Sequence, residues 1–410
     1  MRTARPAFAR NLLARSVLAR SALALALCAL SPAAAAASFD DWPTKYAFAD
    51  GTEISATANW AYDVVDFDGD GYGTAATRLK DDGHYRRREV GVNLKKKDVY
   101  DFTAVFDLES KLWLDVALRM DTKAWFGADY GKVRVGYFKT PVSMESVAAS
   151  RSGSMLELSA ASQAIYQGRR TGVEWALEKP RYALGAAYFF GHDLQGDNPG
   201  TTAAARAVWT PVKDKDRVVH LGLTGSVENP HGFRDGRGAY FGPAARFRAR
   251  PQNGLTGVRL VDSGSLRDTD KIVRNGVEAL WIDGPWSVQA EYLRATAERD
   301  NGQRDFTAAG YYVTGSWVLT GETRPYSGNN VGNIKPAHGF GAVELLARYG
   351  ELDLDDGGIA GGKQRDWTLG ANWYLTTHFK FQANYVHVKA DKGLLAADPD
   401  LVELRAQVQF

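Results

Sequence analysis

The chain has 410 residues, of which 45% are hydrophobic and 24% are charged, and its formal net charge is +2. Beyond residue 38 no apolar run approaches the 18 or so residues that a membrane-spanning helix needs, and the mean hydropathy is −0.32, so a helical membrane protein is excluded. A charge so close to balance gives no general argument for anionic partners.

Residues 1–37 have the composition of a secretory signal peptide. Five arginines form a basic start, residues 22–30 are an apolar run, and alanines 35–37 offer a small-residue cleavage site. Removing these five arginines from the 50 basic residues leaves 45 against 48 acidic residues, a net charge of −3. Cys28 is the only cysteine, so the mature chain would carry no thiol, which fits an oxidising periplasm.

From residue 54 onward the chain repeats a segment of alternating apolar and polar residues followed by a turn. Alternation with a period of two is typical of a strand with one apolar face, and long series of such strands are typical of a transmembrane antiparallel β-barrel. About sixteen strands are predicted, at residues 54–62, 90–94, 102–108, 112–120, 132–139, 173–177, 182–190, 203–209, 219–223, 277–281, 286–292, 311–319, 343–349, 367–375, 379–385 and 402–410. The alternative is a large soluble β protein such as a propeller or a sandwich.

The lengths of the connections predict the orientation of the barrel, because such barrels keep short turns on the periplasmic side and long loops outside. Residues 95–98, 178–180, 284–285 and 376–377 are short connections, whereas residues 63–85 and 229–275 are long ones. The residues expected to form an aromatic girdle near the periplasmic turns are Trp209, Trp281, Trp286, Trp317 and Trp373. Residues 321–340 are long for a periplasmic turn.

The final strand ends in Phe410, which resembles the assembly signal of outer-membrane barrels.

One long connection has the properties of a functional loop. The alternation stops at Lys139 and Pro141 and resumes only at Thr171, which leaves roughly 30 residues without a strand or helix period. A loop of that length usually has a function of its own.

An acidic segment near the start resembles the opening of a calcium-binding loop. Asp66, Asp68 and Asp70 alternate before Gly71, but the twelfth position of the loop is Thr77 rather than glutamate. A weak extracellular calcium site is therefore one interpretation. The others are an acidic outer loop or a contact with lipopolysaccharide through bridging cations.

The sequence predicts no catalytic residue. The seven histidines are scattered, and neither H-E-x-x-H nor G-x-S-x-G occurs. His220 is a candidate by position only. A channel is expected rather than an enzyme.

The strongest local charge signal is Arg246-Phe247-Arg248-Ala249-Arg250. In an extended segment these three arginines share one face at spacings of about 6 to 7 Å. Residues 230–275 carry nine basic and four acidic residues, and residues 139–170 carry four and two, so positive charge gathers in these two loops.

Several motifs resemble the phosphate-selective porins O and P of Gram-negative outer membranes. They are Arg134-Val135-Gly136, Phe138-Lys139-x-Pro141-x-Ser143-x-Glu145, Gly168-Arg169-Arg170-Thr171-Gly172, Arg248-x-Arg250-Pro251 and Glu344-Leu345-x-Ala347-Arg348-Tyr349. The resemblance implies that the third extracellular loop folds into the barrel and narrows the pore. It also implies an anion-guiding ladder of Arg246, Arg248 and Arg250, and a constriction formed by Lys139, Ser143 and Arg151 together with Arg86, Arg87 and Arg88. A homotrimer is implied by the family alone.

The sequence therefore predicts a signal peptide at residues 1–37 and a single outer-membrane barrel at residues 38–410. The expected function is passive diffusion of small anions, phosphate or polyphosphate, with no cofactor and no nucleic-acid partner. A general or differently selective porin on the same barrel is the main alternative, and a structural or enzymatic barrel is the other. The barrel is expected to contact outer-membrane lipid and lipopolysaccharide.

Overall fold

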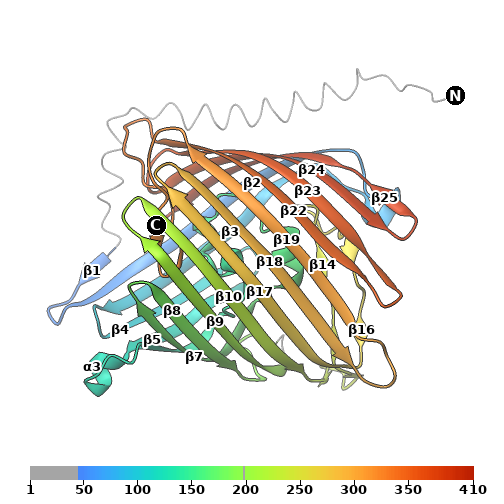
Figure 1. Cartoon of the computed structure of the whole chain (residues 1–410), viewed down its shortest axis with the longest axis horizontal. Coiled ribbons are helices and arrows are strands. Elements are labelled where there is room, and N and C mark those ends of the chain that lie inside the picture. Colours follow the sequence, from blue (N-terminus) through green and yellow to red (C-terminus); the bar gives the residue numbers. More distant parts are fainter. Residues whose placement is uncertain (1–44, 197–198) are drawn as a thin grey trace. The chain divides into compact units, whose positions relative to one another are not determined.

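The structure, a computed structural model, describes residues 45–196 and 199–410. The predicted signal peptide, residues 1–37, lies outside the described residues. Long antiparallel strands pair in chain order, and the last pairs with the first to close a barrel (Figure 1). Its strands are β2 Thr52–Asp68, β3 Asp82–Lys96, β4 Tyr100–Asp107, β5 Leu112–Asp121, β6 Lys132–Lys139, β7 Arg169–Lys179, β8 Tyr182–Phe189, β9 Gly200–Lys213, β10 Arg217–Pro230, β17 Thr269–Asp283, β18 Trp286–Arg299, β19 Phe306–Val318, β22 Ala342–Asp356, β23 Ile359–Tyr374, β24 Phe379–Lys392 and β26 Asp400–Gln409.

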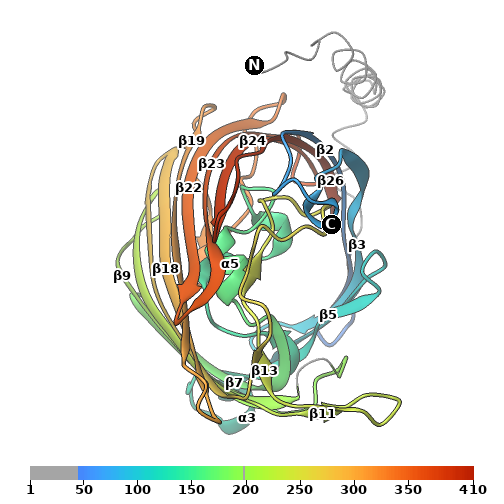
Figure 2. The ribbon, with the colours of Figure 1, turned by 90° about the vertical axis from the view of Figure 1, so that its right-hand side faces the viewer.

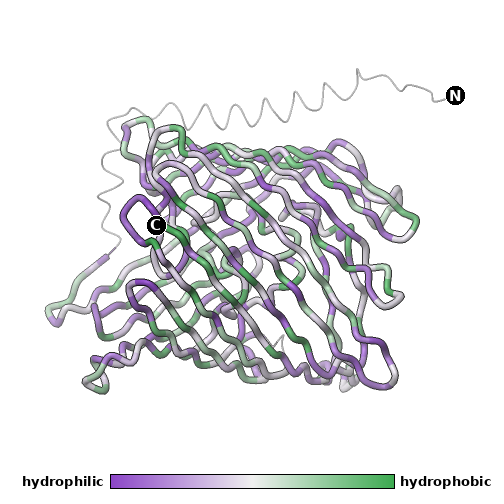
Figure 3. The backbone as a smooth tube through the Cα atoms, in the orientation of Figure 1, coloured by the Kyte–Doolittle hydropathy of each residue, from purple (hydrophilic) through white to green (hydrophobic). Residues whose placement is uncertain are grey.

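The barrel confirms the sixteen predicted strands and their antiparallel order. Hydropathy alternates along the strands, as Figure 3 shows, and the two sides of each strand differ in exposure. Leu221 and Leu223 of β10 are exposed on the outer face, whereas His220 and Gly222, which alternate with them, are buried on the inner face. The alternation in the sequence therefore corresponds to an apolar outer wall and a polar lumen. Among the described residues, no helix is long and apolar enough to cross a membrane.

The connections at the two ends of the barrel differ in length. Residues 97–99, 180–181, 214–216, 284–285 and 375–378 are short and lie at what we call the periplasmic end. The third and fifth connections at the opposite, extracellular end are long, and we call them L3, residues 140–168, and L5, residues 231–268. The long connection at residues 319–341 belongs to the periplasmic end and contains the hairpin β20 Tyr326–Ser327 and β21 Asn330–Val331.

Short elements shape the loops. L3 contains α4 Met144–Val147, η2 Ser150–Ser152 and α5 Ala160–Ile165. L5 contains β11 Phe233–Arg234, β12 Tyr240–Phe241, β13 Ala244–Ala245, β14 Arg248–Ala249, β15 Val261–Asp262 and β16 Leu266–Arg267. The remaining elements are β1 Lys45–Ala47, η1 Ala75–Thr77, α3 Thr122–Phe126 and β25 Leu395–Ala397.

L3 and L5 form the apolar core of the molecule inside the barrel. Helix α5 packs against β18, β19 and β22, and its alanines contact Phe247 and Ala249 of L5. Figure 2 shows α5 within the ring of strands and L5 crossing the same opening. A cavity of about 1270 Å³ remains between L3 and the wall formed by β2 to β9. This cavity is the candidate permeation pathway.

Candidate permeation pathway

L3 is fixed to the barrel wall because inward-facing side chains bind its backbone. Lys380 Nζ donates hydrogen bonds to the carbonyl oxygens of Arg151 (3.0 Å) and Gly153 (3.1 Å). Other L3 carbonyl oxygens accept from Arg405, Arg348, Arg274, Asn372 and Gln382. Buried carbonyl groups need such partners, so the polar wall substitutes for the water that L3 loses inside the barrel.

A carboxylate on the wall fixes the start of α4. Glu291 is buried and accepts hydrogen bonds from the backbone N–H groups of Met144 (2.8 Å) and Glu145 (2.7 Å) and from the Tyr312 hydroxyl (2.6 Å). These contacts satisfy backbone donors that have no partner within so short a helix. L3 is thereby anchored through both its donors and its acceptors.

Lys139 borders the cavity at the point where L3 leaves β6. Its Nζ atom donates to the carbonyl oxygens of Ser146 (2.8 Å) and Ala148 (2.5 Å). Lys139 therefore holds the turn after α4 and brings its charge to the pathway. Ser143, by contrast, is buried with φ of 70°, and its Oγ caps α4 by accepting from Ser146 N (3.2 Å). Its hydroxyl faces the loop.

Arg151 spans the gap between L3 and the closure of the barrel. Its Nη1 atom donates to Thr57 Oγ1 (3.0 Å) and to the Phe410 carbonyl oxygen (3.1 Å). The side chain borders the cavity. The structure thus brings Lys139 and Arg151 to one pathway.

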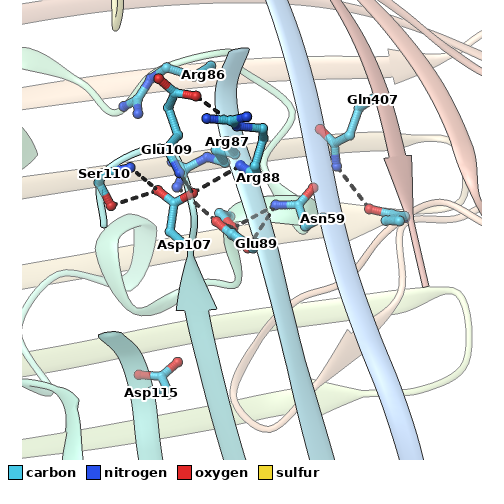
Figure 4. Close-up of polar contacts among 12 residues, drawn as sticks. Asn59, Arg86, Arg87, Arg88, Glu89, Asp107, Glu109, Ser110, Asp115 and Gln407 are labelled. Atoms are coloured by element: carbon cyan, nitrogen blue, oxygen red, sulfur yellow. Dashed lines mark hydrogen bonds and ion pairs between the residues drawn. The ribbon is translucent and has the colours of Figure 1, made fainter. Parts of the chain in front are cut away.

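The three consecutive arginines of β3 lie in three different environments (Figure 4). A register shift at Ala61 leaves Arg86 without a residue opposite, and it pairs with Glu157 of L3 at 2.7 Å. Arg87 pairs with Glu89 at 3.1 Å, and Glu89 borders the cavity. Arg88 lies opposite the exposed Trp60, over the Tyr85 ring and 2.9 Å from Glu109, so it points to the other face of the strand.

A series of paired charges, which the sequence did not single out, lines the cavity near Lys139. Arg169 lies 3.0 Å from Asp115, and the similar pairs nearby are Arg134 with Glu174 and Arg119 with Asp101, each at 2.7 Å. Arg169, Arg134, Arg119, Asp115 and Glu174 all border the cavity. The signal that could have identified them is their inward position in the alternation of β5, β6 and β7.

Arg246, Arg248 and Arg250, which we call the L5 arginine row, share one side of an extended segment. Ala245, Phe247 and Ala249, which alternate with them, are buried against α5, whereas Arg246 and Arg248 are exposed. Arg246 pairs with Asp262 through two contacts of 2.8 and 2.5 Å. The Arg248 side chain makes no hydrogen bond or ion pair with a described residue. None of the three borders the main cavity, which Lys139 and Arg151 do border.

Arg259 is a fourth member of this group, which the local sequence pattern did not indicate. Burial, together with the charges of Arg250 and Arg248, lowers the pKa of Arg259 to about 10. Burial and the charge of Arg86 also lower the pKa of Arg250. The cations therefore repel one another, and an anion bound among them would relieve that repulsion.

L3 and L5 meet at a buried ion pair. Although burial opposes its charge, Arg86 and Arg405 lower the pKa of Glu157 to about 2, so this carboxyl is ionised at neutral pH. The Gly254 backbone of L5 lies against the same pair: a Cβ atom there would come 2.0 Å from Arg86 Nε and 2.3 Å from Glu157 Oε1. A larger residue at this position would have to displace the buried pair or L5.

The connection at residues 319–341 also enters the barrel. The Tyr326 hydroxyl lies 2.7 Å from His220 Nδ1, and Asn330 Nδ2 donates to the Met144 carbonyl oxygen of L3 at 2.9 Å. Residues 327–332 border the cavity. The length of this connection, unusual for a periplasmic turn, thus corresponds to a hairpin that reaches L3 from the other end.

Asp66, Asp68 and Asp70 do not converge on one site. Asp70 Oδ1 accepts hydrogen bonds from the backbone of Gly71 (2.8 Å) and Leu79 (2.9 Å), so this side chain shapes the loop. No group of three or more histidine, cysteine or acidic side chains that could hold a metal occurs in residues 45–196 and 199–410.

Residues 54–410 match the family model described as phosphate-selective porin O and P. The chain belongs to this family. Among similar proteins, an uncharacterised protein of Caulobacter vibrioides is 28% identical over 296 residues, which are 68% of this chain and 58% of that protein. Porin O of Pseudomonas aeruginosa is 31% identical over 218 residues, 46% of this chain and 47% of that protein. The matches thus span about half the length of these relatives.

Solved structures of other outer-membrane proteins share the fold. The outer membrane protein OmpT of Vibrio cholerae superposes with a TM-score of 0.56 at 12% identity, covering 88% of this chain and 99% of that chain. An anion-selective porin from Comamonas acidovorans gives 0.53 at 12% identity, covering 88% and 100%. Membership of this porin family places the protein in the Gram-negative outer membrane, and the solved structures share its barrel fold.

Proposed function

We propose that this porin is selective for small anions and conducts phosphate or polyphosphate by passive diffusion. The observation that carries the proposal is the concentration of Arg246, Arg248, Arg250 and Arg259, of which Arg246 is paired with Asp262. Guanidinium groups bind phosphate oxygens in a forked geometry and replace the water that the ion sheds. The L5 arginine row would capture anions before they reach the narrow part.

The constriction would then be formed where L3 approaches the wall. An ammonium group has three donors, and two of those on Lys139 are used by carbonyl oxygens, so one remains for an anion. Arg151 and Arg169 border the same cavity. Asp115 and Glu89 lie beside these cations and would weaken each binding site, so that the ion can leave.

One observation favours the alternative of a general or weakly selective porin. Arg169, Arg134 and Arg119 are each paired with a carboxylate, so the lower pathway has little net charge. If these pairs decide permeation, ions of both signs would pass.

A planar-bilayer experiment separates the two functions. In a gradient of potassium chloride, we expect a reversal potential displaced toward that of chloride, and added phosphate should reduce the chloride current. Sulfate at equal ionic strength tests whether the block is particular to phosphate. A reversal potential near zero with no phosphate block would favour the general porin.

We further propose that residues 1–37 are removed on export and that the barrel is a homotrimer in contact with lipid and lipopolysaccharide. The family supports the trimer, and the composition of the segment supports the cleavage. The amino-terminal sequence of the mature protein and its mass in detergent test these two statements.

A further inference from the structure

The connection between β5 and β6 exposes three large aromatic side chains at the periplasmic end. It spans residues 122–131 and contains α3, whereas the other short periplasmic turns have two to four residues. Trp125 is 58% exposed, Phe126 74% and Tyr130 64%. In Figure 1, α3 stands away from the strands at the end of β5.

Polar contacts hold this turn in a defined shape. The Thr122 hydroxyl donates to the Gly131 carbonyl oxygen (2.7 Å) and accepts from Tyr130 N (2.9 Å), and Asp121 caps α3 by accepting from Lys123 N (3.0 Å). Gly131 has φ of 93°, and a Cβ atom there would lie 2.3 Å from the Ala176 carbonyl oxygen. The hydrogen-bonded shape of the turn therefore holds the three aromatic rings in exposed positions.

A hydrogen bond places the turn beside the outer wall of the barrel. Trp175 Nε1 donates to the Tyr130 carbonyl oxygen at 2.6 Å. Trp175 lies on the outer face of β7, because its neighbour Glu174 faces the lumen and pairs there with Arg134. Tyr130 therefore lies level with an outward tryptophan of the periplasmic end.

The turn continues a girdle that is interrupted at this position. Exposed aromatic residues occupy the periplasmic end of the neighbouring wall from β8 to β23: Tyr182, Trp209, Trp281, Trp286, Trp317 and Trp373. At the same end, β5 and β6 instead carry Leu118, Met120 and Val133. Tryptophan and tyrosine concentrate at the headgroup level of membranes, because their rings are amphipathic.

We propose that the α3 turn inserts Trp125, Phe126 and Tyr130 into the headgroup region of the periplasmic leaflet and anchors the β5–β6 edge of the barrel there. The partner is a phospholipid surface. Continuity with the girdle favours lipid over a second protein, and a standard protein interface needs about 20 to 30 residues a side, far more than this turn offers.

The test uses a single reporter thiol. Because Cys28 is the only cysteine and lies in residues 1–37, Phe126→Cys in the mature chain carries one thiol. It is labelled with an environment-sensitive fluorophore and reconstituted in phosphatidylethanolamine and phosphatidylglycerol vesicles, with or without nitroxide-labelled lipid. The matched control is Lys215→Cys, an exposed position in the 214–216 turn. Channel currents show that both labelled proteins are folded.

We expect blue-shifted emission at position 126 and quenching by the nitroxide lipid at least twofold stronger than at position 215. Blue-shifted emission without lipid quenching would mean that a second copy of the chain covers the turn, and the proposal would be overturned. Emission like that of position 215 would also overturn it. This proposal rests on the membrane location and is independent of the ion that the channel selects.

Discussion

Lys139 has two roles in the structure, and the sequence indicated only the first of them, its charge at the pathway. Its charge borders the pathway, and its ammonium also closes the turn at Ser146 and Ala148. A substitution therefore changes both the local potential and the position of L3. The two effects can be measured separately. Ion selectivity depends on the charge beside the pathway, whereas single-channel conductance depends on the width of the pathway.

The first prediction concerns this residue. Lys139→Met keeps the length of the side chain but leaves two carbonyl oxygens without their donor, so L3 should loosen, single-channel conductance should rise and phosphate block should weaken. Lys139→Glu should in addition shift the channel toward cations. Lys215→Met, at an exposed periplasmic turn, is the control and should leave both quantities unchanged. Unaltered phosphate block in both Lys139 variants would place this residue outside the selective step.

A second prediction at the residue scale concerns Gly254. Gly254→Ala inserts a methyl group into the Arg86–Glu157 pair, so either L5 must move or the pair must break. We expect a loss of about 1 to 3 kcal/mol in the free energy of unfolding, measured by urea titration of the folded barrel in detergent. The control is Gly257→Ala, where a Cβ atom would meet nothing within 4 Å. Equal free energies of unfolding for the two variants would show that L5 moves away from the Arg86–Glu157 pair at little energetic cost.

At the scale of elements, the extended segment of L5 has one apolar face and one face of arginines. Its small and aromatic residues pack on α5, and its arginines are left on the exposed side. The sequence predicted only that the three arginines share one face, because alternation in an extended segment determines which residues lie on the same side. It could not predict Arg259, which approaches the row only through the folding of L5.

The third prediction tests the row as an element. Arg248→Gln with Arg250→Gln should lower the anion current strongly in dilute salt and only slightly at high salt, because screening removes long-range attraction as ionic strength rises. The control removes Arg234 and Arg237, two exposed arginines of the same loop, in the same way. An identical ratio of low-salt to high-salt conductance in the two variants would place the row outside the path of the ions.

The arginines of β3 show where the sequence was insufficient. Three consecutive residues cannot all face the lumen in a regular strand, and the register shift at Ala61 determines which of them do. Their partners are also distant in the chain: Glu157 lies 71 residues from Arg86. Strand positions follow from local alternation, whereas ion pairs across a lumen depend on the packing of loops that have no period.

At the scale of the whole molecule, connections from both ends of the barrel enter its interior. L3 and L5 enter from one end, the β20–β21 hairpin enters from the other, and Asn330 joins the hairpin to L3 at Met144. Strand count and closure were predictable because every strand repeats the same pattern. The positions of the loops inside the barrel were not predictable, because they depend on polar contacts between segments that are far apart in the sequence.

The last prediction follows from the repulsion within this interior. Arg248, Arg250 and Arg259 lie close together with few counter-charges, so a bound anion should stabilise the native state as a ligand does. At a concentration 100 times the dissociation constant, binding at one site contributes about 2.7 kcal/mol. Phosphate should therefore raise the temperature at which the folded, heat-modifiable form is lost, relative to chloride at the same ionic strength. Arg250→Gln with Arg259→Gln should reduce that difference. An equal rise in chloride and phosphate would reveal general screening instead of a phosphate site.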